Sequence, residues 1–451
     1  ENAIPFRKKG VGGNNPAAGR DTGRGETDMT HWTRALLLGA TAAVAATGTA
    51  WAQDKGAAKG AQTVKVAYLD PLSGPFAAVG QNILKHFQVA AETATARQLA
   101  GAGVRFEIVP FDSKGSPQEA LTLLRAIADQ GIHYVVQGQG SHVAIPLSEA
   151  ITRNNERNPK QAIVLLNYAA IDPDLTNSKC SFWHFAFDAN TEMKMEALTD
   201  YIKDRSEIRN VYLLNQNYSH GQQTARYARE LLARKRPDVK IVGEDFVPLG
   251  QVRDFSPYIA KIRAAGADTV ITGNWGTDLV LFVRAARDAG LTAGFYTYYA
   301  GVIGTPTAMG ASGADRVRQV SYWHPNVANN PLEPVYVDFK KRFGEEWYVL
   351  ASYNALGMLA EAIKRAGSAE PLKVAHTMSG MKMSGPMGEI EMRASDHQLQ
   401  QPLFISTFTK AGGPVRFDAE KTGFGFRTEK SIPTYVASTP TSCNMQRPAK
   451  P

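Results

Sequence analysis

Short apolar runs alternate with longer amphipathic stretches along most of this chain. From Val64 onward, turn residues bound the apolar runs, and the stretches between them have the length and spacing of helices. We predict strands at 64–69, 104–111, 133–137, 162–166, 210–215, 240–246, 269–273 and 295–298. We predict helices at 77–99, 116–130, 221–235, 256–265 and 279–289. Strands that alternate with helices in this way form parallel sheets from βαβ units, so the pattern predicts an α/β fold of two similar lobes.

The second predicted helix has a clear start. Ser116 is its expected N-cap, and Pro117 occupies the first helical position, where a missing N–H costs nothing. This is the kind of local signal that fixes one end of an element from sequence alone.

Four loops follow predicted strands and carry small residues, amides, aromatics and one acid. They are 138–141, 167–171, 215–221 and 274–278. In parallel sheets, ligands bind beyond the carboxyl ends of the strands. The composition of these loops suits a pocket for a small organic ligand.

An export signal precedes the first predicted strand. Met29–Arg34 is a short segment with one positive charge, 35–48 is almost wholly apolar or small, and Ala50-Trp51-Ala52 has the small-x-small pattern of a cleavage site. We predict a signal peptide at 29–52, cleaved after Ala52, and a flexible leader at 53–62. Residues 1–28 are interpreted as a spurious or disordered leader. After Ala52 no apolar run is long enough to span a membrane.

Charge and cysteine content narrow the function classes. The net charge is +8, of which 1–52 hold six basic and four acidic residues, so the remainder carries +6. It contains no dense basic run with interleaved aromatics, and we therefore expect no nucleic-acid partner. Two cysteines, Cys180 and Cys443, cannot complete a four-ligand zinc site. In an exported protein they suggest a disulfide, with two buried free thiols as the alternative.

Catalytic motifs are absent from the sequence. It lacks a Gly-x-Ser-x-Gly elbow, a Walker A loop and His-x-x-x-His metal spacing. The glycines of 137–141 form half of a dinucleotide fingerprint, but position 143 is Val where the third glycine would stand. We therefore predict a non-enzymatic protein with no cofactor and no metal.

An ordered set of segments resembles the type I periplasmic solute-binding proteins of ABC importers, in particular the branched-chain amino acid (leucine/isoleucine/valine) binding family. The likeness covers about 64–448. The segments, in order, are Pro71-Leu-Ser-Gly-Pro75, Asp112-Ser-Lys-Gly-Ser116-Pro, Ala169-Ala-Ile-Asp-Pro-Asp-Leu-Thr176, Tyr218-Ser-His-Gly221, Asp254-Phe-Ser256, Asn274-Trp-Gly-Thr-Asp278, Tyr298-Tyr-Ala-Gly301 and Asp396–Pro402.

The resemblance implies two Rossmann-like lobes joined by a three-strand hinge that closes around a ligand. The implied crossings between lobes lie near Phe182–Phe187, Gln319–Trp323 and Ser384–Glu389. We accordingly predict lobe 1 at 63–183 plus 322–386 and lobe 2 at 184–321 plus 387–440, followed by a C-terminal tail at 441–451.

The resemblance implies a ligand-binding role for several individual residues of this chain. Ser141 and the backbone of Ala169, within the loop that continues through Ala170 and Ile171, match positions that hold a ligand carboxylate. Neutral donors can do this through charge-assisted hydrogen bonds. Tyr218 and Phe255 match aromatic positions that line the pocket. Asp278 matches the acid that takes the ligand's ammonium, because a desolvated cation needs a paired charge.

Two departures weaken the case for an α-amino acid. Amino-acid binders of the family often have Thr where this chain has Ile171, and some have an aromatic where it has Val79. Trp275, Tyr298 and Tyr299 could instead stack on an amide or an aromatic acid, or simply pack in the core. Asp278 and Ser141 have a further alternative, which is to cap the helices that follow them.

The function implied by the resemblance is a periplasmic receptor. It captures a small solute, an amino acid or a related carboxylate or amide, and delivers it to an ABC permease. The alternatives are a sensor for an amide or aromatic acid that acts through a receptor partner, and an exported hydrolase. We expect a periplasmic monomer whose partners are the solute and the permease, without direct membrane insertion.

Overall fold

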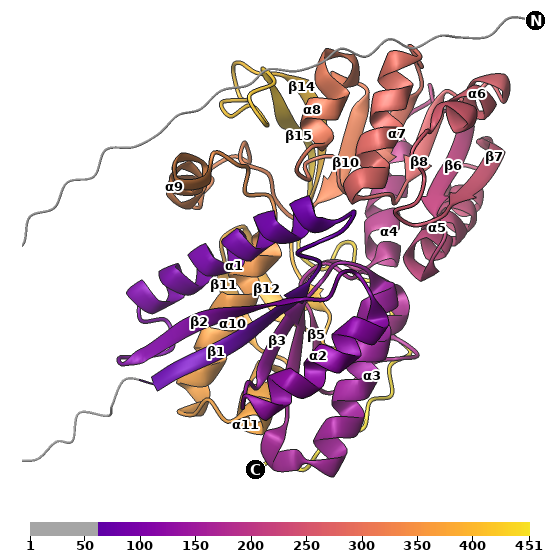
Figure 1. The fold of residues 1–451 in the computed structure, drawn as a ribbon. Helices are drawn as coiled ribbons and strands as arrows, with labels where there is room; N and C mark the ends of the chain where they lie inside the picture. The colour runs from indigo at the N-terminus through magenta and orange to yellow at the C-terminus, as the bar shows by residue number, and fades with distance from the viewer. Residues whose placement is uncertain (1–61) are drawn as a thin grey trace, which may run out of the picture. The chain divides into compact units, whose positions relative to one another are not determined.

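The computed structural model describes residues 62–451 (Figure 1). The predicted leader at 1–28, the signal peptide at 29–52 and most of the flexible leader lie outside the described residues. The predicted strands and helices after residue 62 are present, with ends shifted by a few residues.

The first sheet has five strands, all parallel, in the order β2-β1-β3-β4-β5. Its strands are β1 (Gln62–Asp70), β2 (Val104–Asp112), β3 (Tyr134–Gln137), β4 (Val164–Asn167) and β5 (His184–Ala186). Every residue of β3, β4 and β5 is buried, which explains why the sequence shows apolar runs there rather than alternation.

Helices cover both faces of this sheet (Figure 1). On one face α1 packs on α10, which packs on α11, and on the other face α2 packs on α3. Their bounds are α1 (Ala77–Ala96), α2 (Pro117–Asp129), α3 (Ser141–Arg157), α10 (Leu350–Ala366) and α11 (Pro371–Met378). We call this sheet with its five helices lobe 1. The predicted N-cap is confirmed, because the Ser116 side chain accepts a hydrogen bond from the Glu119 N–H.

The second sheet has seven strands in the order β15-β14-β10-β9-β8-β6-β7. The strands are β6 (Asn210–Gln216), β7 (Lys240–Val247), β8 (Thr269–Thr272), β9 (Gly294–Thr297), β10 (Val317–Ser321), β14 (Leu403–Lys410) and β15 (Phe424–Ile432). Five of these strands, β7, β6, β8, β9 and β10, are parallel to one another. β14 and β15 add an antiparallel edge that the pattern did not predict.

Five helices belong with the second sheet: α4 (Thr191–Ile202), α5 (Ser219–Lys235), α6 (Ser256–Ala264), α7 (Gly276–Asp288) and α8 (Thr305–Met309). α4 packs on α5, and α7 packs on both α6 and α8. We call this sheet and these helices lobe 2. The remaining helix, α9 (Glu333–Phe343), lies between β10 and α10 in the sequence, and three 3₁₀ turns complete the described helices: η1 (Pro159–Gln161), η2 (Pro173–Thr176) and η3 (Gly310–Gly313).

The chain passes between the sheets three times. It leaves the first sheet after β5 and leaves the second after β10, near two of the three predicted crossings. The third prediction, Ser384–Glu389, is wrong, because Gly385 pairs with Gly388 across a hairpin. That hairpin, β11 (Lys382–Gly385) and β12 (Gly388–Met392), forms a small antiparallel sheet with β13 (Leu399–Gln400), and the crossing follows β13.

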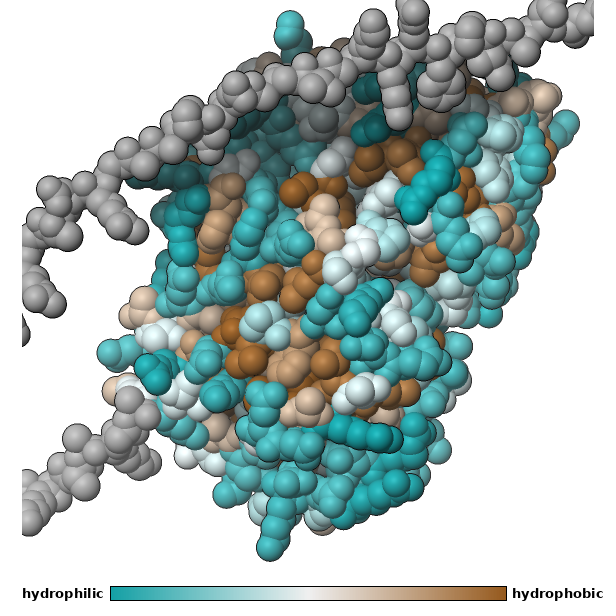
Figure 2. Space-filling view, in the orientation of Figure 1, coloured by the Kyte–Doolittle hydropathy of each residue, from teal (hydrophilic) through white to brown (hydrophobic). Residues whose placement is uncertain are grey.

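Apolar side chains are mostly inside the molecule. Figure 2 shows hydrophilic residues over most of the surface in view, with hydrophobic residues gathered in patches between them. Among residues 62–451, the exposed large hydrophobic side chains are Val337, Tyr435 and Val436. No helix of this described part combines the length and apolarity that a membrane crossing requires.

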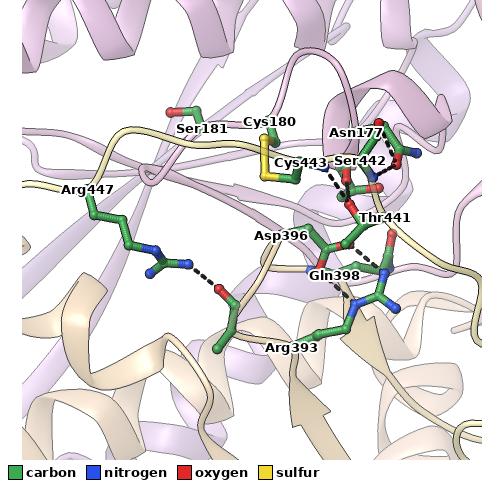
Figure 3. Close-up of a disulfide and its surroundings, with 12 residues drawn as sticks. Asn177, Cys180, Ser181, Arg393, Asp396, Gln398, Thr441, Ser442, Cys443 and Arg447 are labelled. Carbon is green, nitrogen blue, oxygen red and sulfur yellow. Dashed lines mark hydrogen bonds and ion pairs between the residues drawn. A yellow bond between two sulfur atoms is a disulfide. The ribbon is translucent and has the colours of Figure 1, made fainter.

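A disulfide joins Cys180 to Cys443 and fastens the C-terminal tail to the loop after η2 (Figure 3). Hydrogen bonds accompany it. The Thr441 hydroxyl donates to the Thr176 carbonyl at 2.7 Å, and the Ser442 N–H donates to Asn177 Oδ1 at 2.9 Å. The tail is therefore tied to lobe 1 by a covalent bond and by polar contacts.

Replacing both Cys180 and Cys443 by Ser should lower the free energy of unfolding. The bridge closes a loop across a sequence separation of 263 residues, so its loss frees the unfolded chain and costs about 2–4 kcal/mol. Urea unfolding of the wild type and the double variant checks this. With a reductant present, the free energy of unfolding of the wild type should equal that of the variant. The reductant should not change the free energy of unfolding of the variant. Equal stability of the oxidised wild type and the variant would show that the bridge contributes nothing.

Candidate functional site

A cavity of about 100 Å³ lies between the two lobes and is lined by both. Lobe 1 contributes residues that follow β3 and β4, among them Ser141 and Ala169. Lobe 2 contributes residues that follow β6, β8 and β9, among them Tyr218, Trp275 and Tyr298. The lining therefore comes from the carboxyl ends of the strands in both sheets, where the loop composition predicted a pocket.

Most of the predicted ligand residues reach this cavity. The lining includes Ser141, Ala169, Ala170, Ile171, Tyr218, Trp275 and Tyr299. Phe255 and Asp278 are not part of it.

Phe255 lies in the core of lobe 2. Its side chain is 1% exposed, and its ring is 5.6 Å from that of Phe282 and 5.7 Å from that of Tyr258. The residue precedes α6, and packing turns its ring inward, away from the cavity. The aromatic position that the resemblance assigned to the pocket is therefore a core residue here.

Asp278 is fully buried and bonded to protein donors. One carboxylate oxygen accepts from Gln216 Nε2 at 2.7 Å and from the Gly250 N–H at 2.8 Å. Burial raises the pKa of its carboxyl. The alternative role as N-cap is wrong, because α7 begins at Gly276 and Asp278 lies within its first turn. The side chain holds the ends of β6 and β7 to α7.

Ser141 is the first residue of α3 and lines the cavity. Its hydroxyl oxygen accepts from the Asp172 N–H at 3.2 Å, which leaves the hydroxyl proton free to donate to a ligand. The alternative cap role is wrong, because Gly140 occupies the N-cap position. Gly140 has φ +92°, and a Cβ there would lie 2.4 Å from the His142 ring, so only glycine fits.

Asp70 holds the loop that carries Ser141, and its role did not emerge from the sequence. Its buried carboxylate accepts from the Gln139 N–H at 2.9 Å, the Gly138 N–H at 3.2 Å and the Tyr168 hydroxyl at 2.6 Å. Burial raises its pKa to about 7, although these donors oppose the shift. The available signal was an acid at the end of a buried strand.

The loop after β4 is held by side chains of both lobes. Asn167 Oδ1 accepts from the N–H groups of Ala169 at 3.2 Å and Ala170 at 2.8 Å. The predicted backbone donor, Ala169, is therefore already engaged. The Ile171 carbonyl accepts from the Thr191 hydroxyl at 2.8 Å, which ties the loop to the first turn of α4.

Aromatic contacts close one side of the cavity. The Trp275 indole N–H donates to the Tyr218 hydroxyl at 2.8 Å, and Phe76 of lobe 1 stacks on Trp275 with ring centres 4.3 Å apart. The Thr277 hydroxyl donates to the Pro75 carbonyl in the same region. Contacts between the lobes thus enclose the space behind Trp275.

An ion pair that the sequence did not reveal lies in the lining. Lys194 Nζ is 2.7 Å from Asp188 Oδ2, and each side chain is 2% exposed. The ammonium also lies 5.2–5.7 Å from the ring centres of Tyr298, Tyr299 and Tyr322. Burial raises the pKa of Asp188 to about 6, against the pull of Lys194. A lysine on an amphipathic helix normally faces solvent, so no sequence signal pointed to this pair.

The composition of the lining suits the binding of a small molecule. Within 62–451 no three His, Cys, Asp or Glu side chains are grouped as a metal site would require. The lining combines aromatic rings with a few polar groups, which is the composition of a small-molecule site.

Comparison with known proteins decides the family. The model of a family described as periplasmic binding protein matches residues 63–413. The chain belongs to this family. The resemblance derived from the sequence is therefore confirmed, and so is the two-lobe α/β fold.

This periplasmic binding protein has curated relatives of nearly its own length. Leu/Ile/Val-binding protein homolog 4 of Brucella abortus (strain 2308) is 30% identical over 400 residues, which cover 86% of this chain and 94% of the relative. The leucine-, isoleucine-, valine-, threonine-, and alanine-binding protein of Pseudomonas aeruginosa is 23% identical over 73% of this chain and 86% of the relative.

Solved structures agree on the fold. The leucine-, isoleucine-, valine-, threonine-, and alanine-binding protein from Brucella ovis, in a closed conformation, has a TM-score of 0.75 at 30% identity and covers 86% of this chain and 100% of its own. A solute-binding protein of an ABC transporter from Rhodopseudomonas palustris HaA2, in complex with p-hydroxybenzoic acid, has a TM-score of 0.70 at 18% identity over 83% and 98% of the two chains. The latter shows the shared fold alone. The chain is thus a periplasmic solute-binding protein of the ABC-transporter type.

Proposed function

We propose that this periplasmic binding protein captures a small solute, an amino acid or a related carboxylate or amide, in the cavity between its lobes and delivers it to the membrane permease of an ABC importer. The observation that carries the proposal is the cavity itself, which both lobes line and which Phe76 and Trp275 close. The names of the relatives support an amino acid or an analogue as the solute.

Each part of the lining has a task in this proposal. The Ser141 hydroxyl donates to a ligand oxygen, and the rings of Tyr218, Trp275 and Tyr299 exclude water from the ligand's body. Opening separates Phe76 from Trp275 and admits the solute. Closure is a hinge motion about the three passages between the lobes, and it presents both lobes to the permease in one arrangement.

A thermal-shift screen of amino acids, short amides and aromatic acids should find a solute that raises the midpoint of unfolding. A ligand that binds only the folded state adds about 2.7 kcal/mol at one hundred times its dissociation constant. Ser141→Ala should weaken binding of that solute about tenfold through the loss of one hydrogen bond to a charged group. Ser148→Ala, a buried serine of the same helix outside the lining, is the matched control and should bind normally.

Delivery is checked separately by uptake of the identified solute. Cells that lack this chain should lose high-affinity uptake and regain it with the wild type or Ser148→Ala, and regain less of it with Ser141→Ala. No stabilising solute in the screen would contradict capture. Normal uptake without the chain would contradict delivery.

A further inference from the structure

The ion pair of Asp188 and Lys194 is placed to meet a ligand. Asp188 comes from the first passage between the lobes, just after β5, and Lys194 comes from the first turns of α4. Both line the cavity and both are almost completely buried. The pair therefore places two full charges in the wall of the cavity.

Among residues 62–451, hydrogen bonds do not satisfy every donor and acceptor of this ion pair. A lysine ammonium has three donors, and here one of them serves Asp188 while three tyrosine rings surround the rest of the group. Asp188 Oδ1 has no hydrogen-bond partner among the described residues. A buried ion pair stabilises a protein only when its remaining donors and acceptors are also satisfied. Two residues that line the cavity thus retain unsatisfied groups, the spare donors of Lys194 and the Oδ1 acceptor of Asp188.

The other ionisable groups of the lining add no net charge. Burial lowers the pKa of His220 to about 4 and that of His324 to about 3, so both rings are neutral at pH 7. The charge of Glu346 is paired with Lys340, whose Nζ is 2.8 Å from Glu346 Oε1 and 3.8 Å from Asp418 Oδ1 outside the lining. Glu346 Oε1 also accepts from the Glu420 N–H at 2.9 Å. With Lys194 balancing Asp188, a ligand of net charge would bring an uncompensated charge into a buried site.

We propose that the Asp188–Lys194 pair recognises the polar head group of the solute, and that this head group is neutral overall, with a hydrogen-bond acceptor next to a donor. Lys194 donates to a ligand oxygen, and Asp188 Oδ1 accepts from a ligand N–H. The zwitterionic head of an amino acid and a primary amide both offer this chemistry, whereas a simple carboxylate or amine offers half of it. The inference rests on the proposed function and narrows its solute class.

This assigns the ligand's N–H to a different acid from the one expected from the sequence. Asp278 lies outside the lining and already accepts two protein hydrogen bonds. Asp188 lies in the lining, and its Oδ1 has no hydrogen-bond partner among residues 62–451. We therefore expect the ligand nitrogen to contact Asp188, in the passage between the lobes, and not Asp278, in the first turn of α7.

Calorimetric titration with compounds that share one apolar body tests the proposal on the purified full chain. The probes are L-leucine, 4-methylpentanamide, 4-methylpentanoate and 3-methylbutylamine. A second series, L-phenylalanine, 3-phenylpropanamide, 3-phenylpropanoate and 2-phenylethylamine, changes the body and keeps the head groups. Within the series that fits the cavity, the amino acid and the amide should each bind at least about tenfold tighter than the carboxylate and the amine, because only they leave no buried charge unpaired.

Single-charge variants should change the preferred head group. Asp188→Asn leaves a net positive wall, so the carboxylate should gain about tenfold relative to the amide. Lys194→Met leaves a net negative wall, and the amine should gain in the same way. Lys235→Met is the matched control, because Lys235 pairs with Glu196 and Asp200 and lies outside the lining, and it should keep the wild-type order. The double variant Asp188→Asn with Lys194→Met keeps the wall neutral, and far-ultraviolet circular dichroism verifies its fold.

The outcomes separate the inference from the proposed function. A change of head-group preference in both single variants supports the inference. A carboxylate that binds the wild type as tightly as the amide overturns it, and so does an equal loss of every probe in both variants. If a probe binds and Ser141→Ala weakens it while the charge preference never changes, capture stands and the inference falls. If no probe of either series binds, both fall.

Discussion

The protein should lose stability steeply as the pH falls from 7 to 5. Five histidines are buried and neutral: His86, His184, His220, His324 and His397. Burial lowers their pKa values from 6.5 to about 3 or 4. His86 and His324 show why, because in each ring Nδ1 has no hydrogen-bond partner among the described residues, so a second ring proton would be an unsatisfied buried donor.

The direction in which stability changes with pH follows from which state, folded or unfolded, binds more protons. Below pH 6.5 the unfolded chain protonates these histidines and the folded chain does not, so acid favours unfolding. At pH 5 each histidine costs about 2 kcal/mol, and the five together about 10 kcal/mol. Buried carboxyls with raised pKa values act in the opposite direction, and the two with the largest shifts are Asp70 and Asp188. The raised pKa values of Asp70, about 7, and Asp188, about 6, make the folded state take up protons first, which returns about 4 kcal/mol at pH 5.

The net loss, about 6 kcal/mol, is comparable to the whole stability of an ordinary domain. Urea unfolding from pH 8 to pH 5 measures it, and near pH 5.5 the slope should correspond to about three protons taken up on unfolding. His324→Gln should reduce that slope by about one proton. Asp70→Asn should steepen it, because it removes an opposing group. A free energy of unfolding that does not change between pH 7 and pH 5 would contradict the prediction.

The sequence predicted the parallel strands well, for a physical reason. A strand buried on both faces, such as β3 or β4, must be apolar throughout, and turn residues mark its ends. The crossing near Ser384–Glu389, which the resemblance implied, is wrong, and the composition of the segment could not have corrected it. Gly385, Pro386 and Gly388 are turn residues, and composition alone does not distinguish a hairpin turn from a passage between lobes.

The site was predictable as a set of loops and less so as a set of contacts. The carboxyl ends of parallel strands lie at one edge of each sheet, so Ser141 of lobe 1 and Tyr218 and Trp275 of lobe 2 could be assigned to those edges from their positions. The directions of Phe255 and Asp278 depend on the packing of α6 and α7, which no local pattern encodes. Asp188 and Lys194 make contact because the face of α4 that carries Lys194 is buried. A lysine side chain normally lies at the solvent-exposed surface, so the sequence held no sign of this contact.

Gly221→Ala should destabilise the protein severely and impair its site. Gly221 is the third residue of α5, and a Cβ there would lie 1.9 Å from the Gln216 carbonyl oxygen. That oxygen belongs to the backbone at the end of β6 and also accepts from the Tyr218 N–H at 3.0 Å, so it cannot move without the turn that places Tyr218. The expected loss is about 4 kcal/mol or more, the size of effect that marks a backbone clash in a core.

The clash at residue 221 should also weaken binding of the ligand. Gln216 Nε2 donates to Asp278 at 2.7 Å and to the Trp275 carbonyl at 3.2 Å, so a shift of Gln216 disturbs the loop that carries Trp275. Any folded Gly221→Ala protein should therefore bind the solute more weakly than the wild type at a temperature where both are folded. Urea unfolding and calorimetric titration measure the two effects separately.

Gly357→Ala is the matched control, because Gly357 also lies within a helix, α10, and a Cβ there has no atom within 4 Å. Alanine restricts the unfolded chain more than glycine does, so this variant should gain about 0.5–1 kcal/mol and bind normally. Opposite signs from the same substitution would show that the Gln216 carbonyl, and not helix propensity, requires glycine at 221. Similar effects in the two variants would contradict the close approach of α5 to the end of β6, and with it the account of how Tyr218 is positioned.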